Sequence, residues 1–213
     1  MFDNIPNINF KKTSRNPTID SADSNYELPF YKDIDYFSNI DNFVNFINAT
    51  KRMVRRSKDY DMYKAYIINE VGLERCQVLS NVEGDDNVDI EMHHGPILTL
   101  FDVLQIMADH LLNNGEKLTT FDLADLCLEE HFNNNIQVVM LSKTVHEQVH
   151  EGNIFINFKQ GFGDINTFLR KYKDGISKEH INKIQAYIDK SKQYDSFDNG
   201  VLKLSGFVKN WNE

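Results

Sequence analysis

Apolar residues recur three or four positions apart through much of the chain, which is the spacing of one face of an α-helix. This pattern predicts helices over residues 36–58 and 60–71, with Gly72 placed to end the second. It also predicts two helices over 97–112 and 120–131. Their apolar positions are too numerous to remain in water, so these two helices are expected to pack on each other.

Three short segments have the pattern of β-strands. Residues 75–82 and 87–93 are joined by turn-forming residues, so an antiparallel hairpin is expected over 75–94. The apolar run 136–141 predicts a third strand. A short helix is expected over 142–151, where the following glycine takes the position of a C-terminal cap. This helix should pack directly against the hairpin.

Helices over 164–173 and 177–191 and a strand over 201–208 complete the expected elements. Together the elements predict an α+β fold in which helices dominate. We expect four regions. The first two are an extended polar arm, 1–24, and a helical N-terminal region, 25–72. The other two are a mixed core that contains the helical segment 97–131, 73–175, and a C-terminal helix with a tail, 176–213.

Composition excludes several classes of protein. The chain is 41% hydrophobic and 26% charged, as in a soluble globular protein. No apolar run approaches the roughly 18–20 residues that span a membrane, and the N-terminal residues lack the layout of a secretory signal. Cys76 and Cys127 make no disulfide framework. We therefore expect two reduced thiols and a cytoplasmic location. If a phage encodes the chain, this is the cytoplasm of the host.

The formal net charge of −9 counts against binding to nucleic acid, which usually requires a basic surface. The basic residues are nevertheless clustered, so one positive face could coexist with the acidic excess. One cluster, 51–58, contains Arg52, Arg55 and Arg56, which could hold a DNA backbone or form a solvated helix face. A second cluster consists of Lys159, Arg170, Lys171 and Lys173.

Four of the seven histidines fall into two close groups. His93 and His94 end a predicted strand, and the Gly-Pro pair that follows turns the chain. His146 and His150 are four residues apart on a predicted helix, so both rings emerge on one face. Two imidazoles on adjacent turns can bind one transition-metal ion, although such pairs also arise by chance on solvated faces.

The residues around these histidines resemble a known motif. Residues 141–150, LSKTVHEQVH, are similar to the end of the motif of HNH endonucleases (the ββα-metal or His-Me finger family), Leu-Cys-x-x-Cys-His-x-x-x-His. His93-His94 is similar to the opening pair of that motif. The resemblance covers about residues 73–95 and 134–160. It implies an HNH-like ββα-metal core of phage type, with a two-helix insertion and helical N- and C-terminal extensions.

The resemblance implies a role for each histidine of the two groups. In nucleases of this kind the second histidine of the opening pair is the general base, so His94 would deprotonate the attacking water. The residues that match the metal ligands are His93, His146 and His150. They would hold one divalent ion of open identity. Imidazole ligands favour zinc or nickel, whereas phosphate and water would also accept magnesium or manganese.

Other positions of the motif are less regular. The middle Asn falls by spacing at Gln137, with Asn135 as the alternative if the loop is longer. Lys143 could contact a substrate phosphate or be a solvated lysine. Glu91 should share the strand face of His93, where it could orient a ring or form a salt bridge across the hairpin.

The structural zinc knuckle of the family is mostly missing. Cys76 is present, but Leu79, Ser142 and Val145 stand at the other three cysteine positions. The resemblance therefore implies a member without the second zinc, held by apolar packing of Leu79 and Val145. Cys76 would then be a small buried hydrophobe.

Two functions follow from these residues. The first is a metal-dependent DNA endonuclease that hydrolyses phosphodiester bonds, with DNA as its partner. The alternative is a catalytically retired HNH-like scaffold that binds DNA or serves as a structural protein in phage assembly, which the acidic charge and the missing cysteines favour. A third possibility is an unrelated histidine-metal hydrolase. A protein partner could bind through the arm 1–24, and the oligomeric state is left open.

Overall fold

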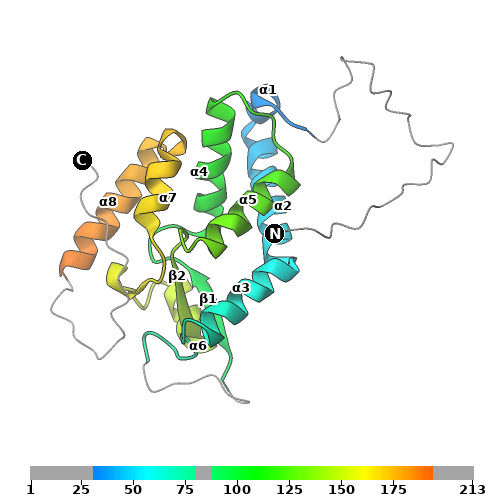
Figure 1. Cartoon of the computed structure of the whole chain (residues 1–213). Coiled ribbons are helices and arrows are strands. Elements are labelled where there is room, and N and C mark those ends of the chain that lie inside the picture. Colours follow the sequence, from blue (N-terminus) through cyan, green and yellow to red (C-terminus); the bar gives the residue numbers. More distant parts are fainter. Residues whose placement is uncertain (1–30, 80–87, 194–213) are drawn as a thin grey trace, which may run out of the picture. The chain divides into compact units, whose positions relative to one another are not determined.

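The computed structural model describes residues 31–79 and 88–193, which lie almost entirely in the second of two units, Lys32–Glu213 (Figure 1). Within these ranges the chain is a helix-rich α+β protein with eight α-helices and one two-stranded antiparallel sheet. The arm expected over 1–24 and the strand expected over 201–208 lie outside the described residues. No helix in the described ranges is both long and apolar enough to span a membrane.

The α-helices are α1 (Ile34–Phe37), α2 (Ile40–Arg56), α3 (Lys58–Asn69), α4 (Leu100–Asn113), α5 (Thr120–Phe132), α6 (Lys143–His150), α7 (Ile165–Lys171) and α8 (Lys178–Gln193). The strands are β1 (Ile90–His94) and β2 (Val138–Ser142), and two 3-10 helices are η1 (Phe158–Gln160) and η2 (Lys173–Gly175). The long helices were therefore predictable from apolar spacing, with ends that differ by a few residues.

Polar side chains determine where several of these helices begin. Thr99 and Thr119 each form a capping box at the start of α4 and α5, in which the threonine and an aspartate three residues later exchange hydrogen bonds. Ser57 separates α2 from α3, because its hydroxyl accepts a hydrogen bond from the N–H of Tyr60. The helix predicted over 36–58 therefore ends at Arg56, and Asn39, which caps the start of α2, divides it from α1.

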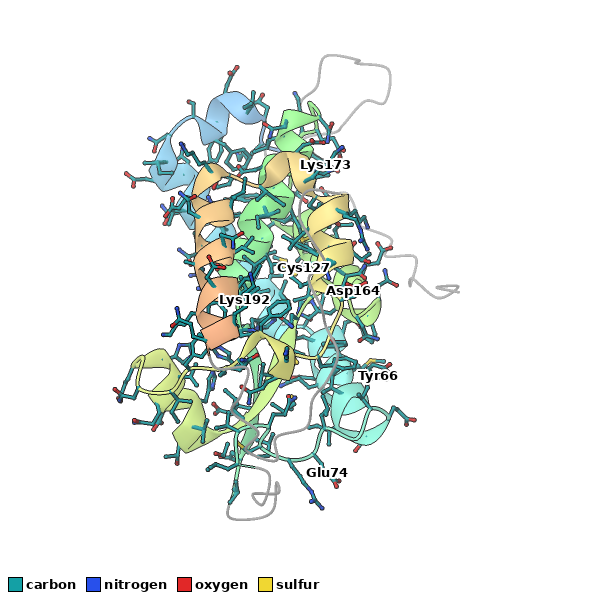
Figure 2. The ribbon with its side chains drawn as sticks, turned by 90° about the vertical axis from the view of Figure 1, so that its left-hand side faces the viewer. Tyr66, Glu74, Cys127, Asp164, Lys173 and Lys192 are labelled. Carbon is teal, nitrogen blue, oxygen red and sulfur yellow. The ribbon has the colours of Figure 1, made fainter. Side chains whose placement is uncertain are left out.

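The segment 97–131 forms two helices, α4 and α5, as predicted. They contact each other, and both pack against α2. Fully buried side chains on these three helices, including Ile47, Leu104 and Leu123, build the main hydrophobic core. Cys127 lies among these inner side chains (Figure 2), and like Cys76 it is a free, buried thiol.

The sheet differs from the predicted hairpin. β1 pairs with β2, in the register His93↔Val139, so its partner follows the helical segment in the chain. Residues 75–79, the described part of the other expected strand, are mostly bends and contain one isolated bridge residue. The strand predicted to end this hairpin is therefore paired with β2 and not with residues 75–79, whereas the residues expected to form the turn lie outside the described ranges, in 80–87. The expectation that the helix near 143–150 packs against this strand is confirmed, since α6 contacts β1.

Gln77, which belongs to the segment expected to pair with β1, hydrogen-bonds to β2 instead. Its backbone N–H donates to the carbonyl of Met140 at 2.8 Å, and its side-chain oxygen accepts from the Met140 N–H at 2.6 Å. Val138 and Phe162 exchange two further backbone hydrogen bonds of 2.8 Å. The edge of β2 that faces away from β1 is thus hydrogen-bonded by a side chain and a loop.

β2 is buried on both faces because it separates two cores. Val138 and Met140 belong to the main core, whereas Val139 and Leu141 belong to a smaller cluster that includes Val145 of α6. Alternate residues of a strand point to opposite faces, so each face of β2 supplies one core. This arrangement accounts for the uninterrupted apolar run in the sequence, and it places α6 over the small core.

Candidate metal centre

The two neighbouring histidines of β1 lie on opposite faces of the sheet, as its register shows. His93 lies opposite Val139, on the face of the small core and α6, and His94 lies opposite Val138, on the face of the main core. Side chains directly opposite each other in an antiparallel pair share a face. The two rings therefore do not share a site.

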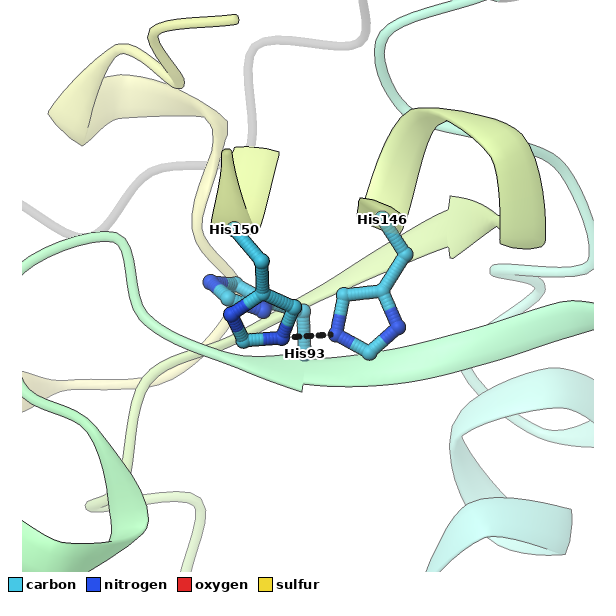
Figure 3. A group of neighbouring side chains, drawn as sticks. All are labelled: His93, His146 and His150. Atoms are coloured by element: carbon cyan, nitrogen blue, oxygen red, sulfur yellow. Dashed lines mark hydrogen bonds between the residues drawn. The ribbon is translucent and has the colours of Figure 1, made fainter. Parts of the chain in front are cut away.

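The histidines of α6 point toward His93 (Figure 3). The Nε2 atoms of His146 and His150 are 3.0 Å apart, and the centre of the His93 ring lies 4.9 Å and 5.1 Å from the centres of their rings. One ligating nitrogen of each ring lies within 4.8 Å of the other two. The structure thus brings together the three histidines that the sequence predicted as metal ligands.

Glu91 lies on the same face of β1 as His93, two residues earlier. Its Oε2 is 2.5 Å from Nδ1 of His146. A carboxylate accepts a hydrogen bond, so this contact places the proton of a neutral His146 ring on Nδ1 and leaves a lone pair on Nε2. That lone pair faces His150 and the centre of the cluster.

Burial and neighbouring charges favour the neutral form of two of the three rings, His93 and His150. Burial, followed by the neighbouring His146 and His150, lowers the pKa of His93 to about 4. Partial burial and then His146 also lower the pKa of His150 below its ordinary value. Neutral imidazole has the lone pair that a metal ion requires.

His94 is enclosed in the main core with a second histidine. Its Nε2 is 2.9 Å from Nε2 of His131, and Nδ1 of His131 is 2.7 Å from the carbonyl oxygen of Cys127. That carbonyl can only accept, so His131 carries its proton on Nδ1, and Nε2 of His94 is the donor between the rings. Tyr60 stacks on the His94 ring at 5.9 Å between ring centres.

This environment does not suit a general base. The remaining nitrogen of His94, Nδ1, is buried and has no hydrogen-bond partner among the described residues. Burial, followed by the neighbouring His131, lowers the pKa of His94 well below its ordinary value. A base must reach the proton that it removes, directly or through one water molecule. His94 is enclosed in the core, 4% exposed and paired with His131.

The histidine pair leads to a prediction about stability. Replacing His94 with phenylalanine keeps the volume of the ring but leaves Nε2 of His131 buried without a donor. We expect a loss of about 1–3 kcal/mol in the free energy of unfolding, measured by urea denaturation. The double variant His94→Phe/His131→Phe should lose less than the sum of the two single variants, because it removes both partners. Strict additivity would contradict the pairing.

Two other residues that were assigned to catalysis hold parts of the chain together. Gln137 is buried, and its Nε2 donates to the carbonyl of Phe158 at 3.2 Å. Asn135 donates from its side-chain amide to the carboxylate of Glu130 at 2.7 Å.

Glu130 is a residue that sequence reasoning missed. It is completely buried, and its carboxylate also accepts hydrogen bonds from the Tyr172 hydroxyl, at 2.9 Å, and from the Lys171 ammonium group. A single glutamate near the end of an amphipathic helix gives no signal of burial. The sequence placed Lys171 in a basic cluster, and in the structure its ammonium group neutralises this buried charge.

The four basic residues proposed for DNA contact are all exposed. Lys143 begins α6, and Arg52, Arg55 and Arg56 lie in the last two turns of α2. Arg55 lies close enough to the histidine cluster to contribute to the lowered pKa of His93. Nothing in this arrangement supports DNA binding over an ordinary solvated surface.

The sequence matches the family of bacteriophage G278-like virion proteins over residues 3–206. The chain belongs to this family. The matched range includes every helix and strand described above. No curated protein and no solved structure matches the chain.

Membership of this virion protein family corrects the expected nuclease function. The chain is not an HNH endonuclease, since the family that it matches is a virion protein family and not a nuclease family. A ββα-metal core is not confirmed either, and Leu79, expected to pack in place of a zinc ligand, is 45% exposed. The expected phage origin is confirmed. As a virion protein, the chain has protein partners in the phage particle.

Proposed function

We propose that the chain is a structural component of the phage particle that works through contacts with other virion proteins. The observation that carries this proposal is the match to a virion protein family along almost the whole chain, 3–206. A match of this extent concerns the complete fold and not a short motif. It favours the structural alternative that the acidic net charge already suggested.

The interior of the protein supports a structural role. His94, the residue that a nuclease would have used as its base, is 4% exposed and is paired with His131. Gln137 and Asn135 likewise bond to other parts of the same chain. These polar groups hold elements of the fold in place, as expected where a protein must keep its shape in an assembly.

The proposal predicts that the chain is retained in purified particles. Phage purified by two successive density gradients should contain the chain at a constant ratio to the major capsid protein, measured by quantitative mass spectrometry. A phage protein that acts only during replication serves as the matched control and should be lost between the gradients. If the chain disappears with the control while infected cells contain it, the structural role is wrong.

A nonsense mutation in the gene provides a second test. Particles made without the chain should be fewer or incomplete by electron microscopy, and wild-type protein supplied from a plasmid should restore them. Particles of normal yield, form and infectivity in its absence would contradict a structural requirement.

A further inference from the structure

We propose that His93, His146 and His150 form a binding site for one divalent transition-metal ion of the zinc class, which links β1 to α6. This site goes beyond the proposed role in the particle, because neither the family nor the fold assigns a metal to the chain. It is a structural site in this proposal, with no reaction attached to it.

The positions of the ligating atoms fit one shared ion. Zinc binds imidazole nitrogen at about 2.0–2.1 Å, so tetrahedral geometry places two such nitrogens about 3.3 Å apart. The Nε2 atoms of His146 and His150 are 3.0 Å apart, and one nitrogen of His93 lies within 4.8 Å of both rings. The His93 ring would complete the set by moving its nitrogen closer to the other two.

The backbone leaves room for the His93 ring. A Cβ atom at Gly95 would lie 3.0 Å from Nε2 and from Cδ2 of His93, which is closer than carbon atoms pack without displacement. The absence of a side chain at this position keeps the ring beside β1, where it faces α6. Any larger residue would press on the ring that must turn toward the ion.

Glu91 adds an observation that does not depend on the three ligands. Its carboxylate oxygen, 2.5 Å from Nδ1 of His146, fixes the tautomer in which Nε2 offers its lone pair to the centre of the cluster. Carboxylates hold metal-binding histidines in this way in many proteins. A hydrogen bond between His146 and His150 alone would explain the 3.0 Å contact, but it would not explain why a third ring faces the same point.

The donor set selects the class of ion. Three imidazole nitrogens suit zinc, nickel, cobalt or copper, whereas magnesium and calcium prefer oxygen ligands. His150 is exposed, so the fourth position of a tetrahedral site opens to solvent and can hold a water molecule.

The ion would stabilise a part of the fold that has little support of its own. α6 has 8 residues, and a helix of this length is not stable in isolation, where about 12–15 residues are needed. Val145 is the one buried residue of α6, and Val149 packs partly buried against the same small core. A metal ion held by two residues of α6 and one of β1 would fix the helix to the strand.

The test uses the full chain, purified without a histidine tag and freed of metal with a chelator. Titration with Zn²⁺ in a calorimeter should show one ion per chain with micromolar or tighter affinity, and Co²⁺ should produce the visible absorption of tetrahedral coordination. His150→Ala removes an exposed ligand without disturbing the core, and we expect at least about 100-fold weaker binding, as for loss of one of three protein ligands. Thr144→Ala, exposed on the same helix, is the matched control and should bind as the wild type does.

A second variant tests the role assigned to Glu91. Glu91→Gln keeps the size of the side chain but removes the carboxylate, and the affinity should fall by about 10–100-fold, the usual effect of losing such a partner. Several outcomes would overturn the site: no Co²⁺ spectrum, binding only at millimolar metal, or an affinity unchanged in His150→Ala. Metal binding by Thr144→Ala at wild-type strength together with loss in both other variants would establish it.

Discussion

Replacing Lys171 with methionine should lower the free energy of unfolding by about 2–4 kcal/mol, although the residue lies partly at the surface. Its ammonium group is bonded to the carboxylate of Glu130, which is completely buried. Methionine keeps most of the apolar length of lysine but removes the charge, so a buried carboxylate remains without its cation. Removing one member of a buried pair usually costs about 3–5 kcal/mol, and we expect less here because the lysine side chain is 46% exposed.

Two variants separate the buried charge from other effects. Lys173→Met changes an exposed lysine of the same basic cluster and should alter the free energy of unfolding by less than about 0.5 kcal/mol. Lys171→Met/Glu130→Gln removes both charges and should regain part of the lost stability. The glutamine oxygen can still accept from Tyr172, and the Asn135 amide can turn so that its oxygen accepts from the glutamine NH2 group. Urea denaturation measures all three. A double variant that is less stable than Lys171→Met would contradict an unpaired charge as the cause.

The helices were largely predictable because their signals are local. The apolar spacing over 97–131 and the threonine caps at its two helices depend on residues within one or two turns of each other. α4 and α5 therefore form where the sequence places them, and their many apolar residues determine that they are buried. The same reasoning found α7 and α8.

The sheet was not predictable by the same means. β1 pairs with β2 across the whole helical segment, whereas sequence reasoning joined it to the nearest strand-like segment, 75–82. Pairing between adjacent segments is the common case, because closing a short loop costs less entropy. Here the side chain and backbone of Gln77 hydrogen-bond to β2, and no local pattern indicates that a glutamine will do so.

The closeness of His93, His146 and His150 was predictable, but the separate position of His94 was not, and the reason lies in the sheet. The spacing of His146 and His150 fixes their common face whatever surrounds the helix. The difference between His93 and His94 depends on the register of β1, which decides which ring faces α6 and which enters the core. A register error of one residue exchanges the two faces of a strand.

The resemblance to HNH endonucleases has a physical origin. A strand that leads into a helix with histidines four residues apart, next to a strand with another histidine, brings three rings together whether or not a reaction takes place. Catalysis requires more, namely a base that reaches solvent and substrate. His94 and His131 form a buried pair instead, and the match of the whole chain is to virion proteins.

Replacing Gly175 with alanine should lower the free energy of unfolding by about 3 kcal/mol, because no space exists for one additional methyl group. A Cβ atom at this position would lie 2.0 Å from the carbonyl oxygen of Ile106 and 2.6 Å from the backbone nitrogen of His110. Both atoms belong to the backbone of α4, which cannot move aside as a side chain can. η2 would have to move away from α4. This movement would break the hydrogen bond of 2.7 Å that the Asn113 side chain donates to the carbonyl of Asp174.

Gly115→Ala provides a control that isolates backbone strain from crowding. Gly115 has a φ of +81°, and nothing lies within 4 Å of the position of its Cβ. Alanine there should cost about 1–2 kcal/mol for the left-handed conformation alone. If Gly175→Ala proves no more destabilising than Gly115→Ala, α4 and η2 are not packed backbone to backbone. If it is clearly more destabilising, and native hydrogen exchange becomes faster in η2 while α6 keeps its protection, the close contact between α4 and η2 is established.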